Sequence, residues 1–86
     1  ELKYLERIGM IHDLRRQVPY ELIPAQRIDG KVIERSCKYI ADFVYYDTCK
    51  AKTIVEDAKS PATRTDSYRI KKKLMLERHG IQIVEV

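Results

Sequence analysis

Two aspartates and a lysine stand out in the middle of the chain, in segments whose patterns are otherwise typical of β-strands. Asp42 lies in the apolar and aromatic run Tyr39–Tyr46, and Asp57 and Lys59 lie at the end of a second run, Lys52–Ala58. A carboxylate within a strand pattern is uncommon, because burying its charge is costly unless it is paired or binds a metal. The two acids therefore mark the first place to look for function.

Two carboxylates and an ammonium group suggest a particular chemistry. Carboxylates within coordination distance of each other repel, and they are tolerated together mainly where a divalent cation neutralises them. Mg²⁺ prefers one or two carboxylates together with water and phosphate oxygens. Lys59 could orient or deprotonate an attacking water, or offset the charge of a pentavalent phosphorane. This combination predicts metal-assisted phosphodiester hydrolysis.

The same residues also admit a purely structural interpretation. Asp57 and Lys59 would then form an exposed ion pair, while Asp42 would cap a turn or pair with Arg35 or Lys38. Exposed pairs of this kind are common and contribute about 0–1 kcal/mol each. The spacing Asp-x14-Asp-x-Lys does not by itself distinguish the two interpretations.

A β-hairpin around the polar segment Asp47–Lys50 would position the three residues. Side chains alternate along a strand, and opposed residues of an antiparallel pair share a face. A loop with an even number of residues puts Asp42 on the same face as Asp57 and Lys59, and puts Glu56 on the other face. A β-bulge would reverse this assignment and make Glu56 an alternative metal ligand.

The remaining segments predict a single α/β domain over residues 1–86, with a mixed sheet and the order helix, three strands, helix, strand. Pro19 lacks an N–H group, so its strand lies at an edge or is bulged there, and Asp29-Gly30 marks a turn. The chain opens inside a helical pattern, so we expect the natural start of that helix to lie upstream. The expected elements are a helix at Glu1–Ile8, a strand at Leu14–Ile23, a strand beginning in Lys31–Cys37 that Tyr39–Tyr46 continues or replaces, the strand Lys52–Ala58, a helix from Thr65 or Asp66 to about His79 with Gly80 as its stop, and a closing strand at Ile81–Val86.

The second predicted helix combines a basic and an apolar set of residues. Ile70 and Leu74 are spaced i, i+4 as a core-facing pair, and Leu76 adds apolar bulk nearby. A separate basic face is formed by residues spaced i, i+3, i+4, namely Arg69, Lys72 and Lys73.

Composition narrows the class of protein without identifying it. The 86 residues include 17 basic and 13 acidic side chains, and the net charge of +4 leans mildly toward polyanionic partners. No apolar run approaches the ~20 residues of a membrane span, so we expect no membrane association. Cys37 and Cys49 lack zinc-site spacing and are expected to be reduced thiols in a cytoplasmic protein.

A family resemblance adds to this picture. Ala41-Asp42 followed by Asp57-Ala58-Lys59, within an αβββαβ order, resembles the PD-(D/E)XK nuclease superfamily, the restriction-endonuclease-like fold. The wider pattern runs through YELIP, YIADFVY, VEDAKS and IKKKL. It resembles, over nearly the whole chain, a family of small, largely uncharacterised nuclease-like proteins of phages and prophages. The resemblance implies a DNA endonuclease that uses Mg²⁺, with Mn²⁺ as a substitute, on branched or other phage DNA.

The resemblance also implies roles for individual residues. Asp42 and Asp57 would bind the metal together with the backbone carbonyl of Ala58, and Lys59 would be the catalytic lysine. Gln17 would help to position the site or the DNA. Further DNA contacts would come from the basic helix face, namely Arg69, Lys72 and Lys73.

Two departures from the family pattern leave a second function open. Ala41 replaces the proline of the superfamily name, at a position that is not a ligand. The family pattern also has a helical glutamate that would precede Glu1. If that acid completes the site, this chain would be a non-catalytic DNA-binding or assembly module that retains the fold. A homodimer is a further expectation, because so small a core leaves apolar surface to cover.

Overall fold

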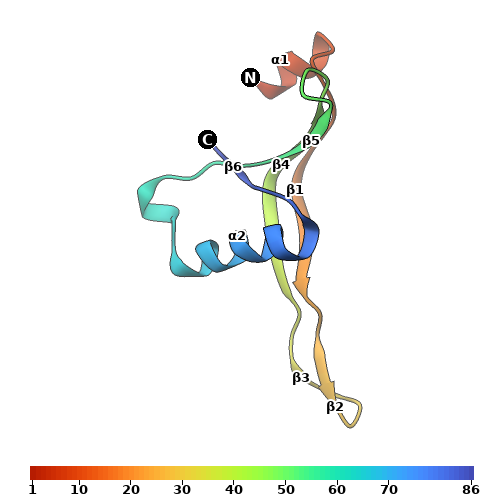
Figure 1. Ribbon diagram of the computed structural model, residues 1–86, viewed down its shortest axis with the longest axis vertical. Coiled ribbons are helices and arrows are strands. Elements are labelled where there is room, and N and C mark those ends of the chain that lie inside the picture. The colour runs from red at the N-terminus through yellow and green to blue at the C-terminus, as the bar shows by residue number, and fades with distance from the viewer.

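The computed structural model describes residues 1–86 and has the mixed α/β fold that the sequence predicts (Figure 1). Apart from a two-stranded ribbon, β2 and β3, the order of elements is αβββαβ, as expected. The elements are α1 (Leu2–Arg7), β1 (Ile11–Ile23), β2 (Gln26–Ile28), β3 (Lys31–Glu34), β4 (Cys37–Asp47), β5 (Lys52–Asp57), the 3-10 helix η1 (Pro61–Thr63), α2 (Asp66–His79) and β6 (Val84–Glu85). Neither α-helix combines the length and apolar character needed to cross a membrane.

The main sheet has the strand order β1-β4-β5-β6, and only the β5–β6 pair is parallel. In the β4–β5 hairpin, Asp47 pairs with Lys52 and Phe43 pairs with Glu56. The paired numbers have an odd sum, so the register predicted from an even loop is confirmed. β1 is an edge strand, which is one of the two alternatives that Pro19 predicts, because proline has no N–H group to donate to a neighbouring strand.

Helix α2 packs on one face of the sheet through Tyr68 and Met75, which are buried. The predicted core face of this helix is wrong in part: Leu74 is half-buried against the core, but Ile70 and Leu76 are 58% and 57% exposed. The buried residues Tyr68 and Met75 are seven residues apart and therefore share one helix face. Ile70 lies only two residues beyond Tyr68, so it points away from the sheet. The core comprises Leu22, Tyr39, Ala41, Val44, Val55, Tyr68, Met75 and Ile83.

Helix α2 begins and ends at the residues that the sequence predicts. The Thr65 hydroxyl accepts a hydrogen bond from the Tyr68 N–H at 3.1 Å, which satisfies one free donor of the first turn. Gly80 ends the helix in the left-handed conformation, with φ of +66°. The two ends of α2 therefore follow from local capping chemistry.

The β2–β3 ribbon differs from the expectation that Lys31–Cys37 begins a strand of the main sheet. β3 pairs only with β2, and β4 starts separately at Cys37. Asp29 and Gly30 both have positive φ, which is the two-residue hairpin turn that Asp-Gly favours. Every residue of the ribbon strands is exposed, and the ribbon extends away from both helices (Figure 1).

Candidate functional site

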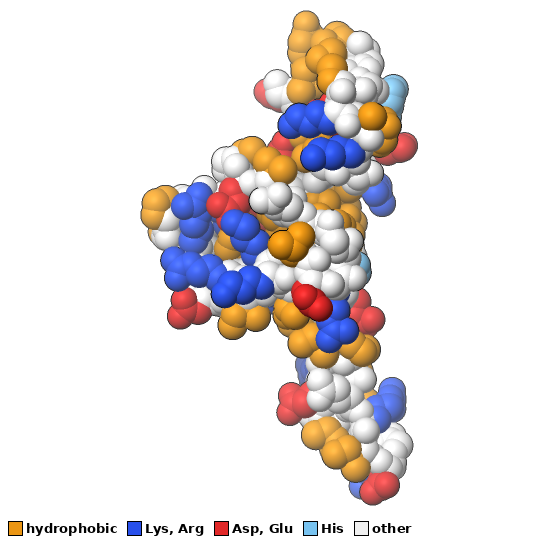
Figure 2. All heavy atoms as spheres, in the orientation of Figure 1, with side chains coloured by type: hydrophobic (Ala, Val, Ile, Leu, Met, Phe, Trp, Pro, Cys, Tyr) orange, Lys and Arg blue, Asp and Glu red, His pale blue; other side chains and the backbone are white.

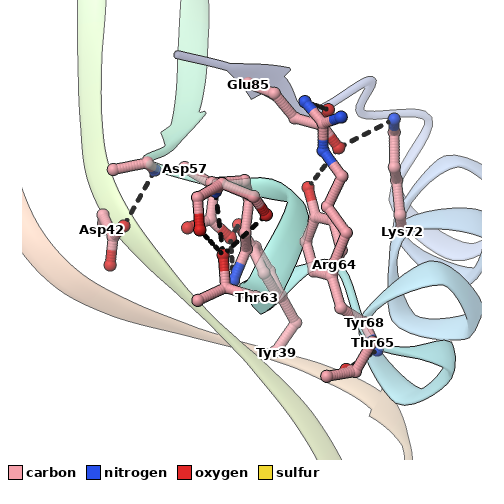
Figure 3. A network of polar contacts seen from close by, with 12 residues as sticks. Tyr39, Asp42, Asp57, Thr63, Arg64, Thr65, Tyr68, Lys72 and Glu85 are labelled. Atoms are coloured by element: carbon pink, nitrogen blue, oxygen red, sulfur yellow. Dashed lines mark hydrogen bonds and ion pairs between the residues drawn. The ribbon is translucent and has the colours of Figure 1, made fainter.

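Two acidic residues lie side by side where the β4–β5 hairpin meets helix α2. Phe43 and Glu56 are paired, so continuing the register places Asp42 directly across from Asp57. Asp57 is in turn paired with Glu85 of β6 on its other side. Acidic side chains therefore follow one another across three neighbouring strands, with α2 beyond them (Figure 3).

Asp57 is the one buried charged side chain, with 3% of its surface exposed. The Tyr39 hydroxyl donates a hydrogen bond to Oδ2 of Asp57 at 2.6 Å, and Nζ of Lys59 lies 3.6 Å from the same oxygen. Burial raises the pKa of Asp57 above its ordinary value. The contact with Asp42 adds to this increase, whereas the bond from Tyr39 and the charge of Lys59 oppose it.

Asp42 is half-buried, and its Oδ2 accepts a hydrogen bond from the Ala58 N–H at 2.9 Å. Burial acts to raise the pKa of Asp42, but donors and charges around it outweigh burial and lower that pKa. These are the Ala58 N–H, the contact with Asp57, the Lys59 ammonium and Gln17. Opposite shifts are expected for neighbouring carboxyl groups that share a proton, because two like charges in contact are unfavourable.

Gln17 reaches the site from β1, at a position where the backbone conformation is unusual. Its neighbours pair as Arg16 with Phe43 and Val18 with Ala41, so Gln17 stands opposite Asp42. Gln17 has φ of +54°, a backbone conformation that residues other than glycine rarely adopt. The β1–β4 register is nevertheless continuous at this position, and a hydrogen bond from Gln17 helps to lower the pKa of Asp42.

Lys59 is held between the acids and helix α2. Its Nζ lies 4.3 Å from the centroid of the Tyr68 ring, within the range of a cation–π interaction. Its side chain is 19% exposed, so the ammonium group keeps access to solvent. The structure thus brings together Asp42, Asp57 and Lys59, as the hairpin register requires.

These residues line a cleft of about 480 Å³ between the sheet and the start of α2. Ala58, whose carbonyl is the further ligand that the resemblance implies, also lines the cleft. The sheet contributes Asp42, Asp57 and Lys59, and the segment from η1 into α2 contributes Thr63, Ser67 and Lys71. A substrate in the cleft would meet carboxylates on one side and hydroxyl and ammonium groups on the other.

Glu85 of β6 links the sheet to the segment that forms the other wall of the cleft. It receives a hydrogen bond from the Tyr68 hydroxyl at 2.8 Å and forms ion pairs with Lys72 at 3.0 Å and Arg64 at 3.1 Å (Figure 3). The bonds from Tyr68 and Lys72 lower the pKa of Glu85. No three acidic, histidine or cysteine side chains converge as a metal-binding group. The site therefore offers a pair of carboxylates, and Glu85 ties β6 to α2.

The other candidate residues lie apart from the acid pair. Glu56 is on the opposite face of the hairpin, where it accepts a hydrogen bond from the Tyr45 hydroxyl. On α2, Arg69 is paired with Asp66 at 3.1 Å and Lys72 with Glu85, while Lys73 is exposed outside the cleft. The basic face predicted from residue spacing is thus largely neutralised by internal pairs.

Sequence reasoning missed Tyr39 and Glu85 as partners in the site. Tyr39 precedes Asp42 by three residues, and its aromatic character indicated only a core position. Glu85 lies in the predicted closing strand, and no spacing connects it with Asp57. Only strand pairing brings Glu85 beside Asp57, so no local signal could have identified it.

Comparison with known proteins gives one match. No curated protein and no solved structure matches the chain. A family model described as "Protein of unknown function (DUF1064)" matches residues 1–83, and the chain therefore belongs to this family.

Proposed function

We propose that the protein is a metal-dependent DNA endonuclease of the PD-(D/E)XK kind. The observation that carries the proposal is the arrangement of Asp42, Asp57 and Lys59 on one face of the β4–β5 hairpin, lining a single cleft. Like carboxylates placed together in a partly buried site are typical of cation binding. The αβββαβ order, without the ribbon, agrees with the resemblance on which the superfamily assignment rests.

The donor set fits a hard divalent cation such as Mg²⁺ or Mn²⁺. Asp42 and Asp57 would supply carboxylate oxygens and Ala58 a backbone carbonyl, and these are the ligand types that both ions prefer. Cation binding requires both carboxylates to be deprotonated, so it would oppose the raised pKa of Asp57. When bound, such an ion supplies a Lewis acid that polarises a phosphodiester and lowers the pKa of water.

The protein's own residues would orient the metal ligands and balance the charge of the phosphate. The Tyr39 hydroxyl, 2.6 Å from Asp57, fixes the rotamer of that carboxylate. The Lys59 ammonium lies beside Asp57 and over the Tyr68 ring, so its position is set from two sides. From there it stabilises the negative charge that develops on a phosphate in the cleft.

DNA as the substrate is supported by charge and by the resemblance. The net charge is +4, and Lys and Arg side chains gather over helix α2 (Figure 2). Cys37 and Cys49 are both free thiols, which suits the reducing cytoplasm of a bacterial host in which phage DNA is processed.

A second candidate function is a DNA-binding or assembly module without catalysis. The observation that favours it is that only two carboxylates converge in the cleft, because the neighbouring Glu85 is held by Arg64, Lys72 and Tyr68. Mg²⁺ can be held by one or two carboxylates when substrate phosphates complete the coordination, so the pair remains sufficient for the first proposal. The two functions differ in whether metal produces cleavage.

The test is cleavage of a panel of linear, nicked, flapped and branched DNAs with Mg²⁺, Mn²⁺ or a chelator. We expect products only with metal, and none from the double variant Asp57→Asn/Lys59→Ala. Glu56→Gln is the matched control, because it removes the neighbouring carboxylate on the other face. Cleavage that survives in the double variant would refute the catalytic assignment. Binding without cleavage under every condition would favour the DNA-binding module.

A further inference from the structure

Apart from Lys59, which belongs to the acid pair, the cationic side chains near the cleft fall into two groups. Arg64 and Lys72 are both paired with Glu85, and Arg69 is paired with Asp66. Two other lysines, Lys38 and Lys71, line the cleft and make no ion pair with any carboxylate. The first group holds the protein together, whereas the second is available to a ligand.

The two unpaired lysines approach the cleft from opposite walls. Lys38 lies on β4, four residues before Asp42, which corresponds to about 13 Å along the strand. Lys71 lies on α2 with Ser67 four residues before it, so the two share a helix face, and both line the cleft. The cleft that holds Asp42 and Asp57 therefore has one unpaired ammonium group on its sheet wall and one on its helix wall.

Lys38 lies opposite an acidic residue but forms no ion pair with it. It stands opposite Glu21 in the β1–β4 register, yet no ion pair forms between them. Lys71 is half-buried, whereas the neighbouring Lys72 is turned to Glu85. A cleft whose carboxylates would repel phosphates needs such free positive charge at its walls in order to admit a polyanion.

We propose that Lys38 and Lys71 bind the DNA phosphates on either side of the one that is cleaved, so that a strand crosses the cleft from the β4 wall to the α2 wall. This rests on the proposed function for the identity of the ligand. Phosphate contacts position a nucleic acid without reading its sequence, so both lysines contribute to affinity for every sequence alike. The assignment replaces the basic face Arg69, Lys72 and Lys73 as the main phosphate contact.

The experiment measures binding of a fluorescent DNA oligonucleotide as a function of salt, with Ca²⁺ in place of Mg²⁺ and the DNA checked for integrity after each titration. The variants are Lys38→Gln, Lys71→Gln and their combination. Lys50→Gln is the matched control, because it removes the same charge from the loop at the far end of the β4–β5 hairpin. Thermal melting of every variant confirms that it is folded.

Each cleft lysine that contacts a phosphate contributes about 0.7 to the slope of log K against log salt for a single strand and about 0.9 for a duplex. We expect that loss for each single variant, roughly twice that loss for the combined variant, and none for Lys50→Gln. The variants Lys38→Arg and Lys71→Arg should keep the slope of the parent protein. A slope unchanged in the combined variant, or lowered equally by Lys50→Gln, would overturn the proposal.

The outcome is separable from that of the nuclease assay. A slope that falls as expected, with no cleavage under any metal, leaves the phosphate contacts in place and refutes hydrolysis. Cleavage with an unchanged slope refutes the role of the two lysines and leaves hydrolysis in place.

Discussion

Asp57 and Glu56 are consecutive residues of β5 that face opposite sides of the sheet, and each accepts a hydrogen bond from a β4 tyrosine. Tyr39 donates to Asp57, and Tyr45 donates to Glu56. In both tyrosines, burial first and the bonded carboxylate second raise the pKa of the hydroxyl. The two sides of the hairpin thus contain the same basic unit, a buried tyrosine bonded to an acid.

The two units differ in what surrounds the acid. Asp57 is 3% exposed, faces Asp42 and lies 3.6 Å from Lys59, whereas Glu56 is half-buried and forms no ion pair. A tyrosine–carboxylate bond alone joins two strands. A second carboxylate beside the first creates repulsion that a bound cation can relieve, and the neighbouring ammonium group can bind a phosphate. Glu56 is therefore an internal control for Asp57.

The largest expected contrast between the two sides is in stabilisation by metal. A ligand that binds only the folded state stabilises it by about 2.7 kcal/mol at a hundred times its Kd. For a domain of this size 1 kcal/mol moves Tm by roughly 4–8 °C, so saturating Mn²⁺ should raise Tm by about 10 °C or more.

Differential scanning fluorimetry with and without Mn²⁺ measures this shift. Asp57→Asn should abolish it, and Glu56→Gln should retain it in full. Equal shifts in the two variants would remove the distinction between the two faces and place the cation elsewhere.

The contrast between the two faces could be predicted from sequence because it depends on local rules. Alternation and an even loop fix which side chains of a hairpin share a face, so the sequence predicts Asp42, Asp57 and Lys59 on one face and Glu56 on the other. The ends of α2 at Thr65 and Gly80 follow from capping chemistry in the same way.

The surroundings of the site could not be predicted because they depend on packing between distant segments. Tyr39 and Asp57 are 18 residues apart, and their bond requires the twist and register of the finished sheet. Residue spacing assigned Ile70 and Leu76 to the core, but the rotation of α2 about its axis follows from the burial of Tyr68 and Met75 and leaves both of those residues exposed. That rotation brings Lys71 to the cleft and leaves Lys72 beside Glu85.

A smaller contrast is expected from removing one hydroxyl on each side. Tyr39→Phe deletes a bond that orients a metal ligand, and such partners typically change metal affinity by about 10–100-fold. Tyr45→Phe deletes the corresponding bond to Glu56, which lies on the face away from the proposed cation, and should leave metal affinity unchanged.

Both variants should lose about 1–3 kcal/mol of unfolding free energy, because each leaves a carboxylate without its donor. Calorimetric titration with Mn²⁺ separates the two effects, with urea denaturation as the measure of stability. Equal loss of metal affinity in both variants would show that the effect arises from general destabilisation and not from orientation of Asp57.

The smallest expected effect is the pH dependence of the free energy of unfolding that arises from the ionisation of Asp57. Its pKa is raised above the ordinary value of 3.8 in the folded protein, so between these two values the folded state binds more protons than the unfolded state. Stability contributed by Asp57 therefore falls as pH rises through this window. Asp42 has a lowered pKa and acts in the opposite sense, since its contribution is lost as pH falls below 3.8.

Urea denaturation without metal, from about pH 3 upward, compares the parent protein with Asp57→Asn, which cannot titrate at this position. The parent should lose stability relative to this variant as pH rises above 3.8, and Mn²⁺ should reverse the trend because the cation binds the deprotonated pair. Glu56→Gln keeps Asp57 and should follow the parent. A difference between parent and Asp57→Asn that stays flat across the window would mean that Asp57 ionises as readily in the folded protein as in the unfolded chain. Burial and the neighbouring Asp42 would then not disfavour the ionised form of Asp57, and the reason to expect that a cation relieves repulsion between the two carboxylates would be removed.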